Sequence, residues 1–240
     1  MIRTTYITLF VVLTTIFWGT IAIIISFFSR TGNPVHLIAR IWGRGILFAS
    51  RIKVTVNGLA NIDPSQSYIF MSNHQSNFDI PVILAYLPVQ FRWLAKAELF
   101  KIPIFGRAMR AAGYVKIDRF NQKSAFESLN EAARKMKNGV SVMIFPEGTR
   151  SRDGNIRPFK KGGFIMAIDS KVPIVPVILQ GTWTIMEKSS LRINTGEVSL
   201  NIETPIATSG YTRDNKDDLI ESVRAVICEG FEKLYFNPER

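Results

Sequence analysis

Residues 68–87 read YIFMSNHQSNFDIPVILAYL, which sets a short apolar run, a polar loop and a second apolar run in direct succession. The run YIFMS has the length and composition of a buried strand. Asn73 and Asn77 are turn formers, and Asp79 followed shortly by Pro81 is typical of a helix N-cap. We therefore expect a strand, a loop and a helix, the repeating unit of an α/β fold.

Similar units extend in both directions from this stretch. Further strands are expected at KVTVN (53–57), RWLAK (92–96), GYVKI (113–117), VSVMIF (140–145), PIVPVIL (173–179) and EVSLNIE (197–203). Residues 122–139 and 217–234 space apolar side chains three and four apart, as amphipathic helices do. The sequence thus predicts a mixed, largely parallel central sheet of about seven strands flanked by helices.

The N-terminal segment is apolar. No charged residue occurs across the 26 positions from Thr4 to Ser29, which as a helix would measure ~39 Å. This segment has no small-residue cleavage site of a signal peptide, so we expect it to be retained as a membrane anchor. A buried helix of a soluble core is the alternative. We expect residues 1–52 to form membrane-associated helices and residues 53–240 a separate domain.

A second helix is expected after the turn TGNP, and its charges suggest a membrane surface. His36, Arg40, Arg44 and Arg51 fall on one side at 100° per residue. This pattern predicts an interfacial helix whose arginines meet anionic lipid phosphates, with a solvated face over a protein core as the alternative. Arg30, Arg40 and Arg44 follow the apolar run, which predicts insertion in the cytoplasmic (inner) membrane with the domain in the cytoplasm.

The charge of the whole chain indicates anionic partners. The net charge is +11, and residues 92–161 hold sixteen basic and six acidic residues. Such a region suits a lipid head group, a phosphorylated metabolite, an acidic protein or nucleic acid. Aromatic residues are not interleaved as a single-strand binding face requires, so nucleic acid is not expected. A single cysteine, Cys228, excludes an internal disulfide.

His74 and Asp79 are candidate catalytic residues. Five residues apart in one helix, their side chains would point about 140° apart, so they meet only if the loop bends between them. Such a bend brings the carboxylate to one imidazole nitrogen and leaves the other as a proton acceptor, which is the arrangement of a general base. The alternatives are a structural histidine at a corner and an aspartate that only caps a helix.

Three loops that follow predicted strands carry cations. FPEGTRS (145–151) exposes backbone N–H groups and a guanidinium, GYVKIDR (113–119) ends in Arg119, and Lys96 follows RWLAK. Ligands of α/β sheets bind at the carboxyl ends of the strands, and an arginine there suits a phosphate. Solvated loop charges are the ordinary alternative for each one.

Four of these blocks together resemble a known family. NHQSNFD matches the pattern N-H-x-S-x-x-D of the glycerolipid acyltransferases that include 1-acyl-sn-glycerol-3-phosphate acyltransferases, and GYVKIDR, FPEGTRS and VPIVPV (172–177) resemble its later blocks in order. The resemblance implies that residues 53–240 are an acyltransferase catalytic domain. It also implies transfer of an acyl group from acyl carrier protein or coenzyme A to a lysophospholipid, giving phosphatidic acid.

The resemblance assigns a role to each matched residue. It makes His74 the base and Asp79 its orienting partner, and VPIVPV a wall of the site; Lys116 departs from the apolar residue usual in its block. The implied partners are a bilayer with anionic lipids, the lysophospholipid acceptor and the thioester co-substrate, with no metal and no other cofactor. The residues implied to hold the acceptor phosphate are Lys96, Arg119, Glu147, Gly148, Thr149 and Arg150.

Two alternative functions stay open. One is a lipid hydrolase in which His74 activates water or Ser76, although no G-x-S-x-G motif supports a covalent acyl-serine. The other is a non-enzymatic protein that binds anionic lipids. Glycerol 3-phosphate or another lysolipid is an alternative acceptor.

Overall fold

The computed structural model describes residues 2–29, 31–118, 122–137 and 139–235. Across these residues seven strands form one sheet in the order β1-β7-β6-β2-β5-β3-β4, and every neighbouring pair is parallel except the antiparallel pair β6 and β7. The predicted mixed, largely parallel sheet is confirmed. The strands are β1 (Ile52–Asn57), β2 (Ile69–Ser72), β3 (Phe91–Lys96), β4 (Val115–Ile117), β5 (Ser141–Ile144), β6 (Ile174–Gln180) and β7 (Gly196–Ile202).

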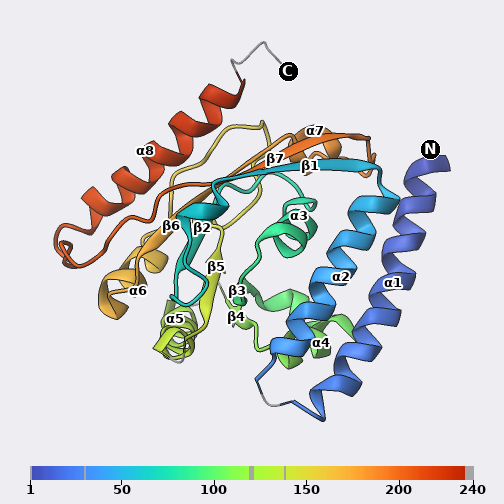
Figure 1. The fold of residues 1–240 in the computed structure, drawn as a ribbon, viewed down its shortest axis with the longest axis horizontal. Helices are drawn as coiled ribbons and strands as arrows, with labels where there is room; N and C mark the ends of the chain where they lie inside the picture. The colour runs from blue at the N-terminus through green and yellow to red at the C-terminus, as the bar shows by residue number, and fades with distance from the viewer. Residues whose placement is uncertain (1, 30, 119–121, 138, 236–240) are drawn as a thin grey trace.

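Helices cover both faces of the sheet (Figure 1). One face packs against the helices α1 to α4, and the other against α5, α6 and α8. The helices are α1 (Ile2–Ser26), α2 (Asn33–Ala49), α3 (Asp79–Tyr86), α4 (Phe105–Ala111), α5 (Gln122–Lys137), α6 (Gly162–Ser170), α7 (Thr182–Ile185) and α8 (Lys216–Tyr235), with short 3₁₀ turns η1 (Leu59–Asn61) and η2 (Ala97–Lys101).

The alternation of side chains along β2 shows why the sheet needs both helical layers. Phe70 packs into the core on the side of α1 to α4, whereas Ile69 and Met71 pack into the core beneath α5, α6 and α8. All three side chains are fully buried. A strand buried on both faces reads as a continuous apolar run, as YIFMS does.

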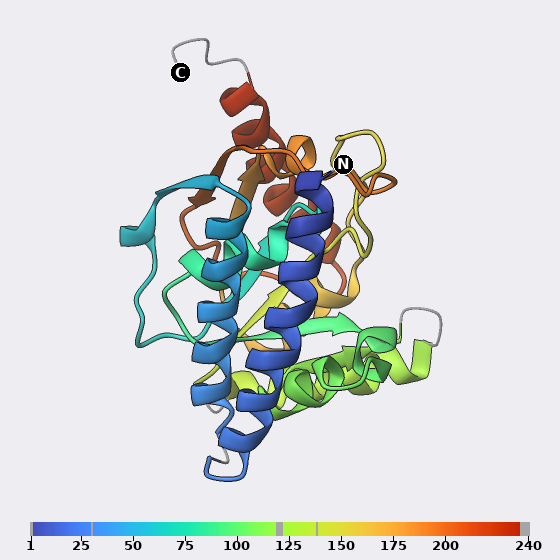
Figure 2. The same ribbon diagram turned by 90° about the vertical axis from the view of Figure 1, so that its right-hand side faces the viewer.

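The helices α1 and α2 form an antiparallel hairpin at one end of the molecule, opposite α8 (Figures 1 and 2). Trp42 Nε1 donates to Thr15 Oγ1 at 3.1 Å across the hairpin. At Gly43 an added Cβ would lie 3.0 Å from the carbonyl oxygen of Pro81, so glycine lets α2 pack closely on α3. By length and composition α1 is long and apolar enough to cross a membrane, and most of it is not buried within the protein.

The prediction for α2 is corrected at His36. This side chain is fully buried, and its Nδ1 lies 3.1 Å from the hydroxyl of Tyr114. Burial lowers the pKa of His36 to about 3, and the charges of Arg92 and Arg40 act in the same direction. The histidine therefore stays neutral inside the protein and does not belong to a lipid-facing basic surface. The exposed large apolar side chains of α2 are Leu37, Ile41 and Phe48.

A buried arginine fixes the turn between α1 and α2. Arg92 on β3 is 2% exposed. Its guanidinium donates to Thr31 O in the turn at 3.0 Å and to Oδ1 of Asn33, the first residue of α2. It also donates to Gln90 Oε1 at 3.1 Å and to Phe91 O at 3.0 Å. Two hydrogen bonds from this one side chain therefore hold the hairpin to the sheet.

Candidate active site

Two loops meet at the carboxyl ends of β2 and β5. These strands are parallel neighbours, so the loop after Ser72 and the loop after Ile144 leave the same edge of the sheet. The first loop is anchored by Asn73, whose side chain donates to Leu179 O and accepts from Leu179 N, both at 2.8 Å. The backbone N–H of Ser151 donates to His74 O at 2.8 Å and joins the two loops.

His74 and Asp79 are in direct contact. His74 Nδ1 lies 2.7 Å from Asp79 Oδ2, which also accepts the backbone N–H groups of Gln75 at 2.8 Å and Ser76 at 2.9 Å. The Asp79 side chain is fully buried, whereas that of His74 is 15% exposed. A carboxylate only accepts, so Nδ1 carries the hydrogen and Nε2 is left as an acceptor. The sequence-predicted bend thus brings the two side chains together.

The predicted N-cap role of Asp79 is wrong. Phe78 occupies the N-cap position of α3, and Asp79 is the first residue of the helix. Its carboxylate points back to the preceding loop, where the oxygen Oδ2 accepts hydrogen bonds from two backbone amides and from the imidazole. The other oxygen, Oδ1, is buried and has no hydrogen-bond partner within the described residues. Asp79 therefore orders the loop around His74.

Two aromatic rings fix the plane of the His74 imidazole. Its ring is stacked on Phe145 with a centroid distance of 3.8 Å and an interplanar angle of 9°. Phe145 is in turn stacked on Trp93 at 5.4 Å. The stack therefore fixes the orientation of the imidazole ring.

Glu147 holds backbone rather than facing an anion. Its Oε1 accepts from His74 N at 2.7 Å, and its Oε2 accepts from Arg157 N at 2.9 Å. The side chain is almost completely buried. Burial raises its pKa to about 7, partly offset by these two hydrogen bonds. Glu147 was expected at the acceptor phosphate, but its two oxygens support the loops on either side of the site.

The turn after Glu147 is cationic. Gly148 has φ +72°, a backbone conformation that favours glycine. The side chain of Lys160 lies next to it, because an added Cβ would be 2.9 Å from Lys160 Cε. Lys188 Nζ donates to Thr149 Oγ1 at 2.9 Å and to Arg150 O at 2.8 Å. In the part of the chain that the structure describes, Arg150 Nη1 is buried without a hydrogen-bond partner. Such an atom is costly unless a guest accepts its hydrogen.

The other predicted site residues lie in different places. Lys96 lines the same cavity as His74 and pairs with Glu98 at 3.2 Å. Arg119 lies outside the described residues. VPIVPV was expected to form a wall of the site, but residues 172–177, all described, do not line the cavity. Lys116 lies on β4 and is exposed.

Ser76 is not placed as a nucleophile. Its side chain is fully buried, its Oγ donates to Met186 O at 2.7 Å, and the same oxygen accepts from Phe78 N at 3.2 Å. Both roles of the hydroxyl are used to hold the loop. This geometry argues against the covalent acyl-serine alternative.

The site opens into a cavity of about 790 Å³. Its walls are largely apolar, and His74, Thr149, Arg150 and Lys188 line its polar part. A cavity of this size and composition suits a ligand with a long apolar portion and a charged group. Apolar lining residues from α1, α2, α3 and α4 include Trp18, Ile38, Trp42, Leu84, Phe105 and Met109.

The α/β fold holds a histidine–carboxylate pair beside a cationic turn and an apolar cavity. This combination defines a class of proteins that act on the hydroxyl or ester groups of lipid-like ligands. A family model described as Acyltransferase matches residues 53–180, more than half of the chain. The chain belongs to the acyltransferase family.

Individual relatives agree with this assignment. A chloroplastic 1-acyl-sn-glycerol-3-phosphate acyltransferase from Brassica napus is 37% identical over 88% of this chain, which spans 63% of that protein. The corresponding alpha enzyme of Homo sapiens is 34% identical over 76% of this chain and 65% of its own length. The chain thus spans slightly less than two thirds of these two relatives. The crystal structure of the 1-acyl-sn-glycerophosphate (LPA) acyltransferase PlsC from Thermotoga maritima is 30% identical, covers 100% of this chain and 97% of its own, and superposes with a TM-score of 0.85.

No role in the site was predicted from the sequence for Lys188, Lys160 or Phe145. Lys188 follows α7 and lies beyond the four matched blocks, and Lys160 follows the FPEGTRS block by nine residues, so neither has a local pattern that points to the site. Phe145 lies inside a matched block, but its stacking on His74 depends on the pairing of β2 with β5.

Proposed function

We propose that this protein is a 1-acylglycerol-3-phosphate O-acyltransferase. It moves a fatty acyl group from a thioester to the free hydroxyl of 1-acyl-glycerol-3-phosphate and forms phosphatidic acid. One observation carries the proposal. His74, which contacts Asp79, lines the same cavity as Thr149 and Arg150 of the cationic turn. The names of the relatives support the same acceptor.

In the proposed reaction His74 acts as the general base. Nε2 takes the proton of the acceptor hydroxyl while its oxygen attacks the thioester carbonyl carbon, and this step forms the new C–O bond. The C–S bond then breaks, and the imidazolium returns the proton to the leaving thiolate. Asp79 stabilises the imidazolium between these steps. No covalent enzyme intermediate is needed, because the hydroxyl attacks the thioester directly.

The cationic turn is proposed to hold the acceptor phosphate. The guanidinium of Arg150 can bind two phosphate oxygens at once and so fixes the direction of the acceptor. Gly148 and Thr149 form the turn, and Lys96 lines the same cavity. For Arg119 we keep the role that the resemblance implies, which is to bind the acceptor phosphate. Holding the phosphate in one orientation presents the acceptor hydroxyl to His74.

Membrane association is proposed to rest on the apolar face of the N-terminal hairpin. Its exposed large side chains are those of Ile2, Tyr6, Leu9, Val12, Leu13, Ile16, Phe17, Ile24, Phe27, Phe28, Leu37, Ile41 and Phe48. Flotation with vesicles of zwitterionic and anionic lipids tests this role. Binding that the double change Phe27→Ser and Phe28→Ser leaves unchanged would contradict it. The orientation toward the cytoplasm stays a prediction from the arginines after α1.

The activity is tested with a matrix of donors and acceptors on the purified protein. The donors are acyl carrier protein and coenzyme A thioesters, and the acceptors are 1-acyl-glycerol-3-phosphate, glycerol 3-phosphate and other lysolipids, with products identified by mass spectrometry. We expect phosphatidic acid with 1-acyl-glycerol-3-phosphate, and a loss of ~10²- to 10⁴-fold in turnover in His74→Ala. Free fatty acid as the main product in the presence of every acceptor would favour a hydrolase instead.

A further inference from the structure

Lys188 has contacts that the proposed reaction does not yet explain. It lies in the segment between α7 and β7, beyond the residues 53–180 that match the family model. Its ammonium nevertheless reaches the turn of the FPEGTRS block, where it donates to Thr149 Oγ1 and Arg150 O, and it lines the cavity. An ammonium has three donors, so these two bonds leave one hydrogen for a guest.

The charges around Lys188 are unfavourable without an anion. Burial lowers its pKa, and the charges of Arg152, Arg157 and Arg150 lower it further, while Glu147 acts in the opposite direction. The carboxylate of Glu147 is already engaged by two backbone N–H groups. The loop that carries Arg157 also holds Gly154, where an added Cβ would lie 3.8 Å from the indole ring of Trp183 on α7.

A purely structural role does not require a charged residue at this position. Two hydrogen bonds to a hydroxyl and a carbonyl need a donor, which a neutral amide also supplies. A lysine next to three arginines adds repulsion that a neutral residue would avoid. Among the residues that the structure describes, the buried Arg150 Nη1 at the same turn has no hydrogen-bond partner and also requires an acceptor. Both features are explained by one multiply charged anion bound between Arg150 and Lys188.

We propose that Lys188 is a phosphate-binding residue that, together with Arg150, selects acceptors with a phosphate monoester. This inference rests on the proposed function. A phosphate monoester carries close to two negative charges near pH 8, since its second pKa is about 6, whereas a phosphodiester carries one. Two cations, Arg150 on the turn and Lys188 beside it, match the monoester better. Lysophospholipids whose phosphate bears a further head group are therefore poorer acceptors.

The test compares acceptors that differ in charge. Transfer to 1-acyl-glycerol-3-phosphate and to uncharged monoacylglycerol is measured for wild type, Lys188→Met, Lys188→Gln and Lys188→Arg. We expect Met and Gln to raise the KM for the phosphorylated acceptor about 10- to 100-fold, because a hydrogen bond to a charged group is lost. Transfer to monoacylglycerol should change less than about twofold, and Arg should restore most of the affinity.

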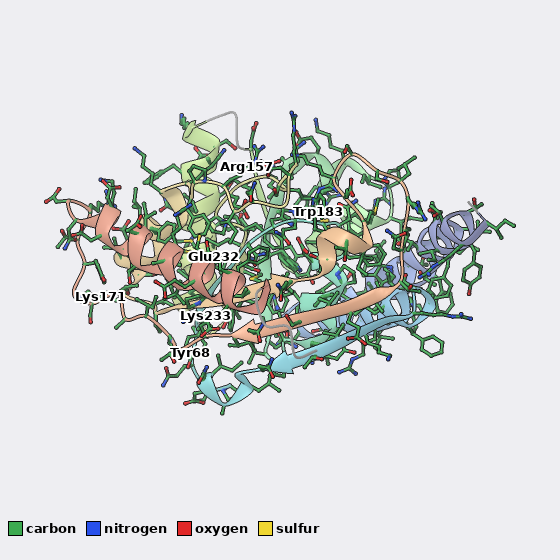
Figure 3. All side chains as sticks on the ribbon, turned by 90° about the horizontal axis from the view of Figure 1, so that it is seen from above. Tyr68, Arg157, Lys171, Trp183, Glu232 and Lys233 are labelled. Carbon is green, nitrogen blue, oxygen red and sulfur yellow. The ribbon has the colours of Figure 1, made fainter. Side chains whose placement is uncertain are left out.

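Lys233→Met is the matched control, since Lys233 is exposed on α8, away from the N-terminal hairpin (Figure 3). An equal loss on both acceptors, or a Gln variant that behaves as wild type, would show that Lys188 only braces the turn.

A second measurement separates this inference from the proposed function. Binding of glycerol 3-phosphate is titrated by calorimetry for wild type, Lys188→Met and Lys233→Met, without any donor. Weaker binding in Lys188→Met alone supports the phosphate contact even if the transfer assay identifies another acceptor. Equal binding by all three proteins overturns the inference, whatever activity the wild type has. Thermal melting of each variant confirms that it is folded.

Discussion

Asp79→Asn should remove most of the turnover while the protein stays folded. In wild type, Asp79 Oδ2 accepts hydrogen bonds from the imidazole and from two backbone amides, and its charge lies beside Nδ1 at 2.7 Å. Taking about 4 Å between the centres of charge and an effective dielectric constant of about 20, the attraction to an imidazolium is about 4 kcal/mol. Because this attraction exists only once His74 has taken the proton, its loss lowers kcat about 10³-fold.

The same change has a smaller cost in stability. An asparagine keeps one oxygen for the three N–H donors, but its amide nitrogen then occupies the position of Oδ1, which is buried and has no partner in the described part of the chain. Two unsatisfied hydrogens there cost about 1–3 kcal/mol. The predicted signature is thus a large loss in turnover with a modest loss in stability.

Single-turnover transfer from an acyl thioester measures the chemical step of Asp79→Asn directly, and denaturant unfolding measures its stability. Asp63→Asn is the control, because Asp63 is an exposed carboxylate in a loop before β2. The KM for the acceptor should change little, since Asp79 contacts the base and not the phosphate. A folded Asp79→Asn protein with a chemical step within tenfold of wild type would refute the role given to the carboxylate.

Two further changes test the supports of the site. Arg92→Met removes the hydrogen bonds that the guanidinium donates to the carbonyl groups of Thr31 and Phe91, so it should lower the free energy of unfolding by about 3 kcal/mol. Denaturant unfolding measures this loss, with the exposed Arg134→Met as the control. An unchanged midpoint would contradict the anchoring role. Burial raises the pKa of the Glu147 carboxyl from about 4.5 in the unfolded chain to about 7 in the folded protein, so folding favours its protonated form. The stabilisation from this group is therefore complete below pH 4.5 and is lost as the pH rises through 7, which lowers the free energy of unfolding by up to about 3 kcal/mol. Glu147→Gln should flatten this part of the curve of stability against pH, and identical curves would rule out its titration there.

The elements of the fold could be predicted because each strand and helix is a local pattern. All seven expected strands occur, since short apolar runs bounded by turn residues have few other structures in a protein of this size. The sequence predicted less well which side chains of each helix are buried. Phe126 fits the apolar spacing of α5 but is 54% exposed, because spacing does not say how far the covered stripe extends. His36 was misplaced for a related reason, since the surface that covers it comes from Phe91 and Tyr114, far along the chain.

By itself, the sequence determined the α/β class, the approximate positions of the seven strands and of α1, α2, α3, α5 and α8, and the meeting of His74 with Asp79, because that contact spans five residues and a single turn. The helices α4, α6 and α7 were not predicted. Only the tertiary structure decided the role of Glu147, the place of Lys188 and the ring stack on His74. These features depend on which strands are neighbours, because the contacts of Lys188 with Thr149 and Arg150 span 39 and 38 residues and the contact of Glu147 with His74 spans 73. Such segments come together only after the sheet has formed. A local pattern fixes a backbone conformation, whereas the environment of a side chain is fixed by distant segments whose packing no short stretch encodes.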